Sequence, residues 1–264
     1  MRKIKCLFSV VIAICLIMML PLKASAESLS EDTALSGVGE NTQLTDEEAY
    51  KLYEEYLEKE HLQLHVQSDK KSDSLERFVN YAVRENIIED TPLQRDGLQK
   101  SVVRGAFKTV VAAGNAYGYK VAAFCLDHSL QDRPSNLSYG SSSDYALKIQ
   151  HSTEYNKVLN DFMREARSSS KTNITKTGAV SFTSDNDLYL AFHSVDYVAT
   201  GIKSKGRWTV LVTFTDRYNF EAQDWKNNMT DYNAVTVINN YAAHAQNIGA
   251  IVPYNIKIVV KKIV

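Results

Sequence analysis

The sequence predicts an α+β fold, in which an N-terminal helical half precedes an antiparallel β-meander, a further helix and a closing C-terminal strand. Three observations predict this class. Apolar residues recur at helical spacing through much of 45–167, and from about residue 176 they alternate with polar ones. A helical pattern over 237–245 is then followed by alternation over 254–260. Helices first and strands later is typical of α+β proteins.

The composition is that of a globular protein, because 44% of the 264 residues are hydrophobic and 23% are charged. Collagen, coiled coil and wholly disordered chains are excluded. The net charge of −1 hides an asymmetry, since the first 26 residues carry four basic residues and no acid. Removing these four from the 30 basic residues leaves 26 against 31 acidic ones. This balance disfavours a nucleic-acid partner or a strongly basic membrane-surface protein.

Residues 1–26 have the features of a secretory signal peptide, so we expect a secreted protein. A basic n-region precedes an apolar stretch over 6–20, Pro21 ends it, and Ala24-Ser25-Ala26 offers a cleavage site. The apolar stretch is short for a bilayer span, so a retained anchor is the weaker alternative. Cys15 follows Ile14 rather than the small residue of a lipoprotein site, which favours release over a lipid anchor.

Cleavage after residue 26 would leave Cys125 as the one cysteine, with no intramolecular disulfide possible in an oxidising compartment. A lone cysteine is either a nucleophile or a packed thiol. Cys125 shares a helical stripe with Val121 and Phe124, which favours the packed and inert thiol.

The mature chain is divided by composition. Residues 27–44 are polar and without periodicity, so we expect a flexible arm there. Residues 45–264 are expected to form a single α+β domain, with a helical extension over 45–90 and a core over 91–264. Thr45 and Glu48 form a capping-box pattern, and Pro92 is suited to a first helical turn. The predicted strands of the meander cover 180–183, 188–193, 196–203 and 208–216, with a closing strand over 254–260.

No complete catalytic motif is present: the chain has no Gly-rich phosphate loop, no H-E-x-x-H, no C-x-x-C and no G-x-S-x-G. Three polar clusters at the ends of predicted elements remain as candidates. The first follows a helix, where His128 continues the apolar stripe and Gln131 or Asp132 is placed to partner its ring or bind substrate. The alternative is a structural histidine that caps the helix.

The second cluster is the segment 187–193. If it is a strand, alternation places His193 on the face opposite Leu188 and Leu190, open to a ligand. The alternative is a solvated strand histidine.

The third cluster begins at Asp216 and ends at Trp225. By alternation, Asp216 and Tyr218 point to the same side as Trp208 and Phe214, at the rim of an apolar face. Desolvation at such a rim shifts the pKa of a carboxyl group, which suits acid–base chemistry or a metal. The alternative is an Asx turn at the end of a strand.

These clusters carry a resemblance to a known family. HSLQDRPSNLSYG (128–140), DLYLAFH (187–193) and WTVLVTFTDRYNF (208–220) resemble segments of the C-terminal domains of bacterial polymorphic toxins, over roughly residues 98–260. The third segment is also similar to a motif of colicin-M-like toxins, which cleave lipid-linked peptidoglycan precursors. Asn219 stands at the second acidic position of that motif, and no His-Arg pair follows it. The resemblance implies a secreted protein of bacterial antagonism.

We therefore expect an antibacterial hydrolase that acts on a phosphodiester or cell-envelope substrate. In this hypothesis His128, His193 and Asp216 converge, with one histidine as general base, Asp216 orienting it or holding a metal, and Tyr218 donating to developing charge. A site of two histidines and one carboxylate for a metal is a weaker alternative, and the sequence identifies no cofactor.

The expected partners are a cell-envelope component or an immunity-type protein. The alternative function is a non-catalytic extracellular protein that binds a cell surface or protein partner. It is favoured by the lack of a complete catalytic motif and by 15 tyrosines that offer amphipathic contact area.

Overall fold

The computed structural model of the protein describes residues 44–59, 68–221 and 234–264. The predicted signal peptide, the arm as far as residue 43 and Trp225 lie outside the described residues. The chain divides into two compact units. The helical unit consists of the described residues up to Val110 and within Phe220–Ile251, and the sheet unit consists of Val111–Asn219 and Val252–Val264.

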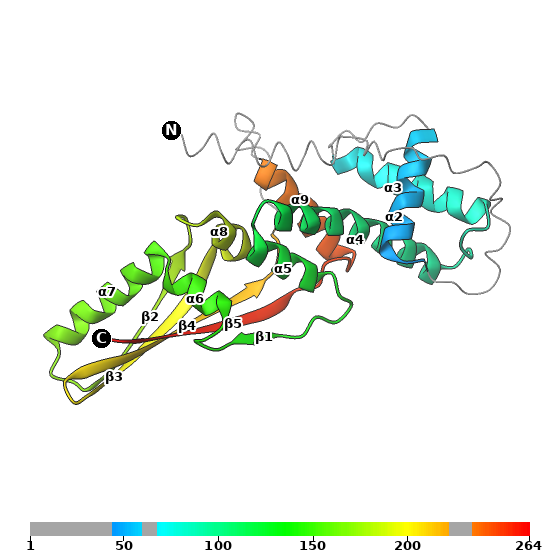
Figure 1. Ribbon diagram of the computed structural model, residues 1–264. Coiled ribbons are helices and arrows are strands. Elements are labelled where there is room, and N and C mark those ends of the chain that lie inside the picture. The colour runs from blue at the N-terminus through cyan, green and yellow to red at the C-terminus, as the bar shows by residue number, and fades with distance from the viewer. Residues whose placement is uncertain (1–43, 60–67, 222–233) are drawn as a thin grey trace. The chain divides into compact units, whose positions relative to one another are not determined.

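The predicted α+β class is confirmed. The described residues form eight helices and one five-stranded mixed sheet, with labels as in Figure 1. In chain order they are α2 (Asp46–Lys59), α3 (Ser68–Arg84), α4 (Pro92–Ala116), α5 (Lys120–Ser129), β1 (Leu137–Tyr139), α6 (Asp144–Gln150), α7 (Thr153–Ser168), β2 (Asn173–Ser181), α8 (Asn186–Phe192), β3 (Ser194–Ser204), β4 (Arg207–Tyr218), α9 (Ala234–Asn247) and β5 (Tyr254–Ile263).

The helical unit begins with the predicted capping box. The Thr45 N–H donates to Glu48 Oε2 at 2.9 Å, and the Glu48 N–H donates to Thr45 Oγ1 at 3.3 Å. Phe78 of α3 is fully buried between Tyr53 and Tyr56 of α2, with ring centroids 5.2 and 5.5 Å away. Aromatic packing therefore holds α2 against α3.

The longest helix, α4, is interrupted in its apolar character by Arg104 and Lys108. No helix within the described ranges is long and apolar enough to cross a membrane.

The sheet has the strand order β1-β5-β4-β3-β2, in which β1 runs parallel to β5 and the other neighbours are antiparallel. Alternation in β4 buries Trp208, Val210, Val212, Phe214 and Tyr218, as predicted. The register places Phe214 between Tyr197 of β3 and Ile258 of β5, which are also buried. We call this side of the sheet the covered face.

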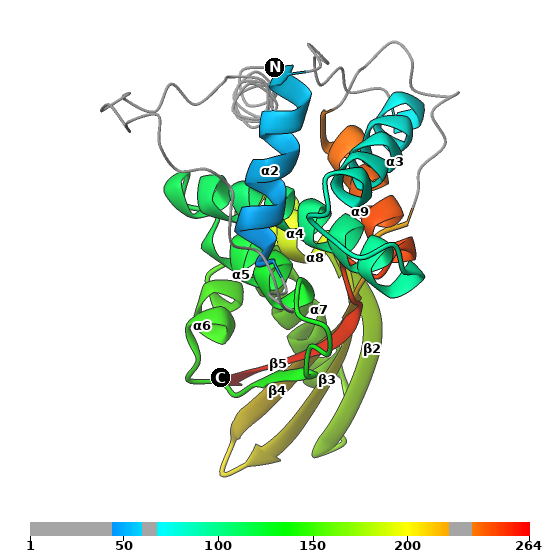
Figure 2. The same ribbon diagram turned by 90° about the vertical axis from the view of Figure 1, so that its right-hand side faces the viewer.

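Helices α5, α6, α7 and α8 lie over the covered face (Figure 1). The other side, the open face, has no described helix of the sheet unit over it, and the strands twist strongly along their length (Figure 2). Exposed apolar side chains of the open face include Val198, Ile202, Leu211 and Ile263. The sheet unit is thus a half-covered sheet, with its core between the sheet and one layer of helices.

The prediction of a strand over 188–193 is wrong. These residues form most of α8, whose N-cap Asp185 accepts hydrogen bonds from the N–H groups of Asp187 and Leu188 at 2.9 and 3.0 Å. The alternating pattern of this short segment also fits two turns of helix, in which Leu188 and Phe192 share the buried side. The meander consists of β2, β3 and β4, and β1 is a further short strand.

Candidate functional site

Asp216 lies near the end of β4, opposite Ile256 of β5 and on the covered face with Phe214 and Tyr218. Its side chain is half-buried. Desolvation raises the pKa of Asp216 to about 6, the Arg217 backbone N–H opposes the rise by hydrogen bonding, and the negative charge of Asp196 adds to it. The structure thus places Asp216 on the side of β4 that alternation predicted, at the rim of the apolar face.

A small apolar void of about 10 Å³ adjoins Asp216 under the helices. Ile149 of α6 and Phe192 of α8 form its roof, and Val195 and Ile256 line it from the strands that flank β4. A carboxylate at the edge of this void has few polar neighbours, which is why its ionised form is disfavoured.

Asp216 also lines an open cavity of about 670 Å³ at the end of the sheet where β4 ends and β3 and β5 begin. Consecutive residues of β4 reach this cavity, namely Thr215, Asp216 and Arg217. Because neighbours along a strand point to opposite sides, Arg217 belongs to the open face and Asp216 to the covered face. The cavity therefore lies at an edge that residues of both faces reach.

The polar wall of the cavity follows the register of the strands. Ser138, Lys257, Thr215 and Asp196 stand in one row across four adjacent strands. In the next row Asn255 is opposite Arg217, and its backbone N–H donates to Asn136 Oδ1 at 2.9 Å. Neither Arg217 nor Lys257 forms an ion pair with another described residue. The wall thus presents two cations to the cavity, together with the carboxylate of Asp196 and with hydroxyl and amide groups.

His128 is held by partners on both ring nitrogens. Its Nε2 lies 2.8 Å from the Ser135 carbonyl oxygen, which accepts only, so Nε2 carries the proton. In the neutral ring Nδ1 then accepts from Gln131 Nε2 at 3.3 Å, and the predicted partnership with Gln131 is confirmed. Asp132 lies exposed in the loop that follows. This arrangement is that of a positioned, structural imidazole.

An aromatic series connects His128 with the strand that carries Asp216. The ring of Tyr254 meets the His128 ring edge to face at 4.6 Å, and Tyr218 lies 5.3 Å from Tyr254. Tyr218 is buried, and desolvation raises its pKa well above the ordinary value. Tyr218 does not line the open cavity, so it is a core residue and not the predicted donor to a substrate.

His193 is neither on a strand nor on a strand face. It is the C-cap of α8, is exposed, and has φ +43° and ψ −72°. Its ring contacts that of Tyr189 edge to face at 5.0 Å. The predicted placement on the side opposite Leu188 and Leu190 failed because the segment is helical.

The three candidate residues were expected to converge, but they do not contact one another directly. No hydrogen bond or ion pair joins any two of His128, His193 and Asp216 in the described part of the chain, and the two histidines do not line the Asp216 cavity. Among residues 44–59, 68–221 and 234–264 there is also no group of three His, Cys, Asp or Glu side chains suited to a metal ion. Asp216 is the candidate that remains in a cavity.

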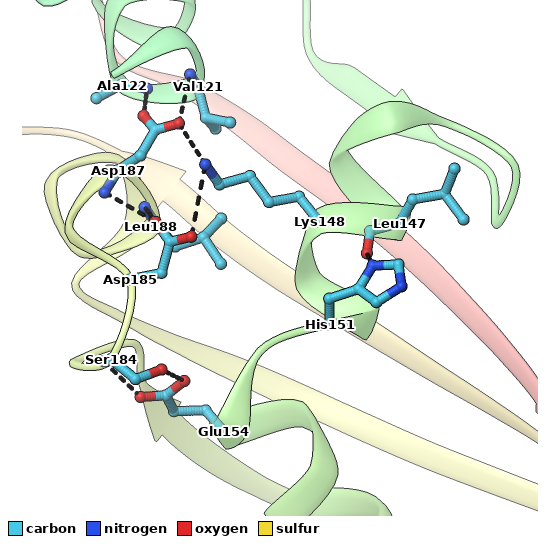
Figure 3. Close-up of polar contacts among 10 residues, drawn as sticks. All are labelled: Val121, Ala122, Leu147, Lys148, His151, Glu154, Ser184, Asp185, Asp187 and Leu188. Carbon is cyan, nitrogen blue, oxygen red and sulfur yellow. Dashed lines mark hydrogen bonds and ion pairs between the residues drawn. The ribbon is translucent and has the colours of Figure 1, made fainter. Parts of the chain in front are cut away.

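Asp187 is a buried carboxylate that the sequence did not single out (Figure 3). It accepts hydrogen bonds from Val121 N at 3.1 Å and Ala122 N at 2.8 Å, in the first turn of α5, and from Lys148 Nζ at 2.8 Å. Desolvation acts to lower the pKa of Lys148, but the hydrogen bond and charge of Asp187 outweigh it and the pKa is raised. With all its partners in place, Asp187 ties α8 to α5 and α6 and has a structural role.

Glu154 closes the other loop of this region in the same way. Its carboxylate accepts from the backbone N–H of Thr183 at 2.9 Å. It also accepts from the backbone N–H of Ser184 at 2.8 Å and from Ser184 Oγ at 2.6 Å (Figure 3). Desolvation acts to raise the pKa of Glu154, but these hydrogen bonds outweigh it and the pKa is lowered. Together Glu154 and Asp187 fix both ends of the segment between β2 and α8.

Comparison with known proteins identifies no relative of this chain. No protein-family model, curated protein or solved structure matches the chain.

Proposed function

We propose that this protein is an exported antibacterial hydrolase of toxin type, with its chemistry centred on Asp216. The observation that carries the proposal is a carboxyl group with a pKa of about 6, placed where an apolar rim meets an open polar cavity. Near neutral pH such a group has both protonation states populated, which is the property of a proton donor in bond cleavage.

The substrate class follows from the cavity wall. Arg217 and Lys257 lie on adjacent strands of the open face, and neither is neutralised by an ion pair with another described residue. Two such cations, beside amide and hydroxyl groups and with Asp196 as the one other carboxylate among the lining residues besides Asp216, suit an anionic group, such as a phosphodiester of the cell envelope. In this proposal they hold the anion while a water molecule attacks the phosphorus and the bond to the leaving oxygen breaks. Asp216 donates its proton to that oxygen, and the proton released by the water goes to solvent, from which Asp216 is protonated again. His128 and Tyr218 support the strand that carries Asp216.

The proposal is tested by directing the protein to the envelope of a test bacterium and, separately, by assaying hydrolysis of a chromogenic phosphodiester. We expect Asp216→Asn to abolish growth arrest and to lower hydrolysis by at least about 100-fold. The matched control is Asp127→Asn, which makes the same change at an exposed aspartate of α5. Arrest that survives both Asp216→Asn and His128→Ala contradicts a catalytic mechanism.

A second candidate function is binding to a cell surface or a protein partner without catalysis. It is favoured by an aromatic group on α5, α6 and β1, in which Phe124 lies 5.5 Å from Tyr145 and Tyr145 lies 4.4 Å from Tyr139. Phe124 is 36% exposed, and both tyrosines are half-buried. Loss of cell binding in Tyr145→Ala, with binding intact in Asp216→Asn, would favour this candidate.

A further inference from the structure

Strand β2 forms one edge of the sheet and pairs with β3 alone among the described strands. The pairing is in register over all nine residues from Asn173 to Ser181 and contains no proline. Natural edge strands of this length are usually shortened, bulged or covered, because their outer backbone groups are ready to pair.

In an antiparallel pair, alternate residues of a strand form hydrogen bonds with the neighbouring strand, and the other residues direct their backbone groups outward. Lys203 N donates to Thr172 O at 2.7 Å, and Phe182 N donates to His193 O at 2.9 Å. Both bonds have the register of the β2–β3 pair, so the even-numbered residues of β2 direct their N–H and C=O groups toward β3. The outward-pointing residues are therefore Asn173, Thr175, Thr177, Ala179 and Ser181, all exposed.

The charges along this edge suit an antiparallel copy of the same strand. The N-terminal end of β2 lies beside the exposed Lys171 and Lys203, and its C-terminal end lies beside the exposed Asp196, which is opposite Ala179. Antiparallel self-pairing keeps the basic N-terminal ends of the two copies apart, whereas parallel pairing would place Lys171 and Lys176 of each copy beside the same residues of the other.

One register fits best. Lys176 is the single charged residue of β2, and its Nζ lies 3.8 Å from Glu165 Oε2. A two-fold axis at Lys176 would place two lysines directly opposite each other, which is unfavourable. An axis at Thr177, the midpoint of the strand, places Lys176 opposite Gly178 and uses all five outward residues.

We propose that β2 is a self-association edge, which pairs antiparallel with β2 of a second copy about a two-fold axis through Thr177. The isologous pairing joins the two sheets into one, with Asn173 opposite Ser181 of the second copy and Thr177 opposite Thr177. This assignment is independent of the proposed hydrolase activity.

Sedimentation of the purified protein over a dilution series tests the proposal. We expect a reversible dimer that Thr177→Val preserves, because valine keeps the outward N–H. Thr177→Pro removes that N–H without touching a β2–β3 hydrogen bond, and we expect dimer affinity to fall by at least about tenfold. Circular dichroism confirms that each variant is folded.

Charge variants test the register without proline. Thr177→Lys and Thr177→Glu each place like charges across the axis, so each alone is expected to be monomeric, while an equimolar mixture associates. A wild-type monomer at every concentration overturns the proposal, and so does a dimer that none of these changes weakens. If the single charge variants dissociate but their mixture does not associate, the axis through Thr177 is wrong.

Discussion

The Nζ of Lys148 lies 2.8 Å from Oδ2 of Asp187, so that a lysine of α6 neutralises a carboxylate that also caps α5. The aspartate side chain is only 5% exposed. Its removal therefore leaves two helix N–H groups without an acceptor, and it leaves Lys148 with Asp185 alone, whose Oδ2 lies 3.5 Å from Nζ.

We expect Asp187→Ala to lower the free energy of unfolding by about 3–5 kcal/mol, since one member of a buried ion pair is lost. Urea denaturation followed by circular dichroism measures the change. Asp127→Ala, at an exposed position of the same region, is expected to stay within about 0.5 kcal/mol of the wild type. Equal losses in the two variants would contradict the structural role of Asp187.

The raised pKa of Asp216 predicts a stability that depends on pH. Its folded pKa of about 6 exceeds the ordinary 3.8, so the folded state holds this proton more tightly than the unfolded state. Stability from this group is therefore present below pH 4 and is lost as pH rises to about 6. Allowing for partial solvent screening, the loss is about 1–2 kcal/mol.

Asp216→Asn removes the titrating group, so we expect it to be more stable than the wild type above pH 6 and similar to it near pH 4. Thermal unfolding across this range measures the difference, and Asp127→Asn is the control. If Asp216→Asn both raises the stability and abolishes growth arrest, Asp216 is a residue that serves function although it lowers the stability of the fold.

If Asp216 is the proton donor, the hydrolysis rate depends on its protonated form. We expect kcat/KM to fall about tenfold per pH unit above pH 6, because the protonated fraction falls at that rate. A profile that is flat from pH 5 to 8 would remove Asp216 from the donor role. The measurement needs no variant, so it separates the role of the carboxyl group from any effect of substitution on folding.

His193 offers a test that separates catalysis from backbone strain. Its φ of +43° is unfavourable for a side chain and favourable for glycine. We expect His193→Gly to raise the free energy of unfolding by about 1 kcal/mol and to leave hydrolysis unchanged. His193→Ala keeps the strain and should give no gain. Loss of activity in both variants would return His193 to the catalytic candidates.

Gly201 marks a close approach between β3 and the helix layer. A Cβ placed there would lie 2.5 Å from the Phe162 ring and 3.2 Å from the Trp208 ring, both buried. We expect Gly201→Ala to cost about 1–3 kcal/mol, measured by urea denaturation. Gly140→Ala is the control, since a Cβ at Gly140 meets nothing within 4 Å. A tolerated Gly201→Ala would indicate that α7 can shift away from the sheet.

Much of the fold was predictable because its elements are determined by short sequence patterns, which can be recognised without knowledge of the tertiary structure. The capping box at Thr45 and the buried side of β4 each follow from a short pattern. The prediction for 188–193 was wrong for the same reason, since the pattern of six residues cannot distinguish two helical turns from a strand. The N-cap Asp185 was the signal available for the helix.

The candidate site was predictable only in part. Alternation placed Asp216 at the rim of an apolar face, but the cavity beside it depends on strand order and register. Nothing along the chain indicates that Lys257 stands in the same row as Asp196, because β5, which follows β4 only after α9, must pair with the β3–β4 hairpin to bring them together. The interaction of Asp187 with α5 spans 66 residues and is equally invisible to a local pattern.

The reactivity of the Cys125 thiol reports on local opening of the sheet unit. The thiol is buried in α5, and desolvation raises its pKa to about 12, although the neighbouring Tyr254 hydroxyl acts to lower it. A thiol in this state is inert to oxidants and alkylating reagents until the helix leaves the sheet. The rate at which a coloured thiol reagent labels Cys125 therefore measures how often this region opens under native conditions, with no engineered probe.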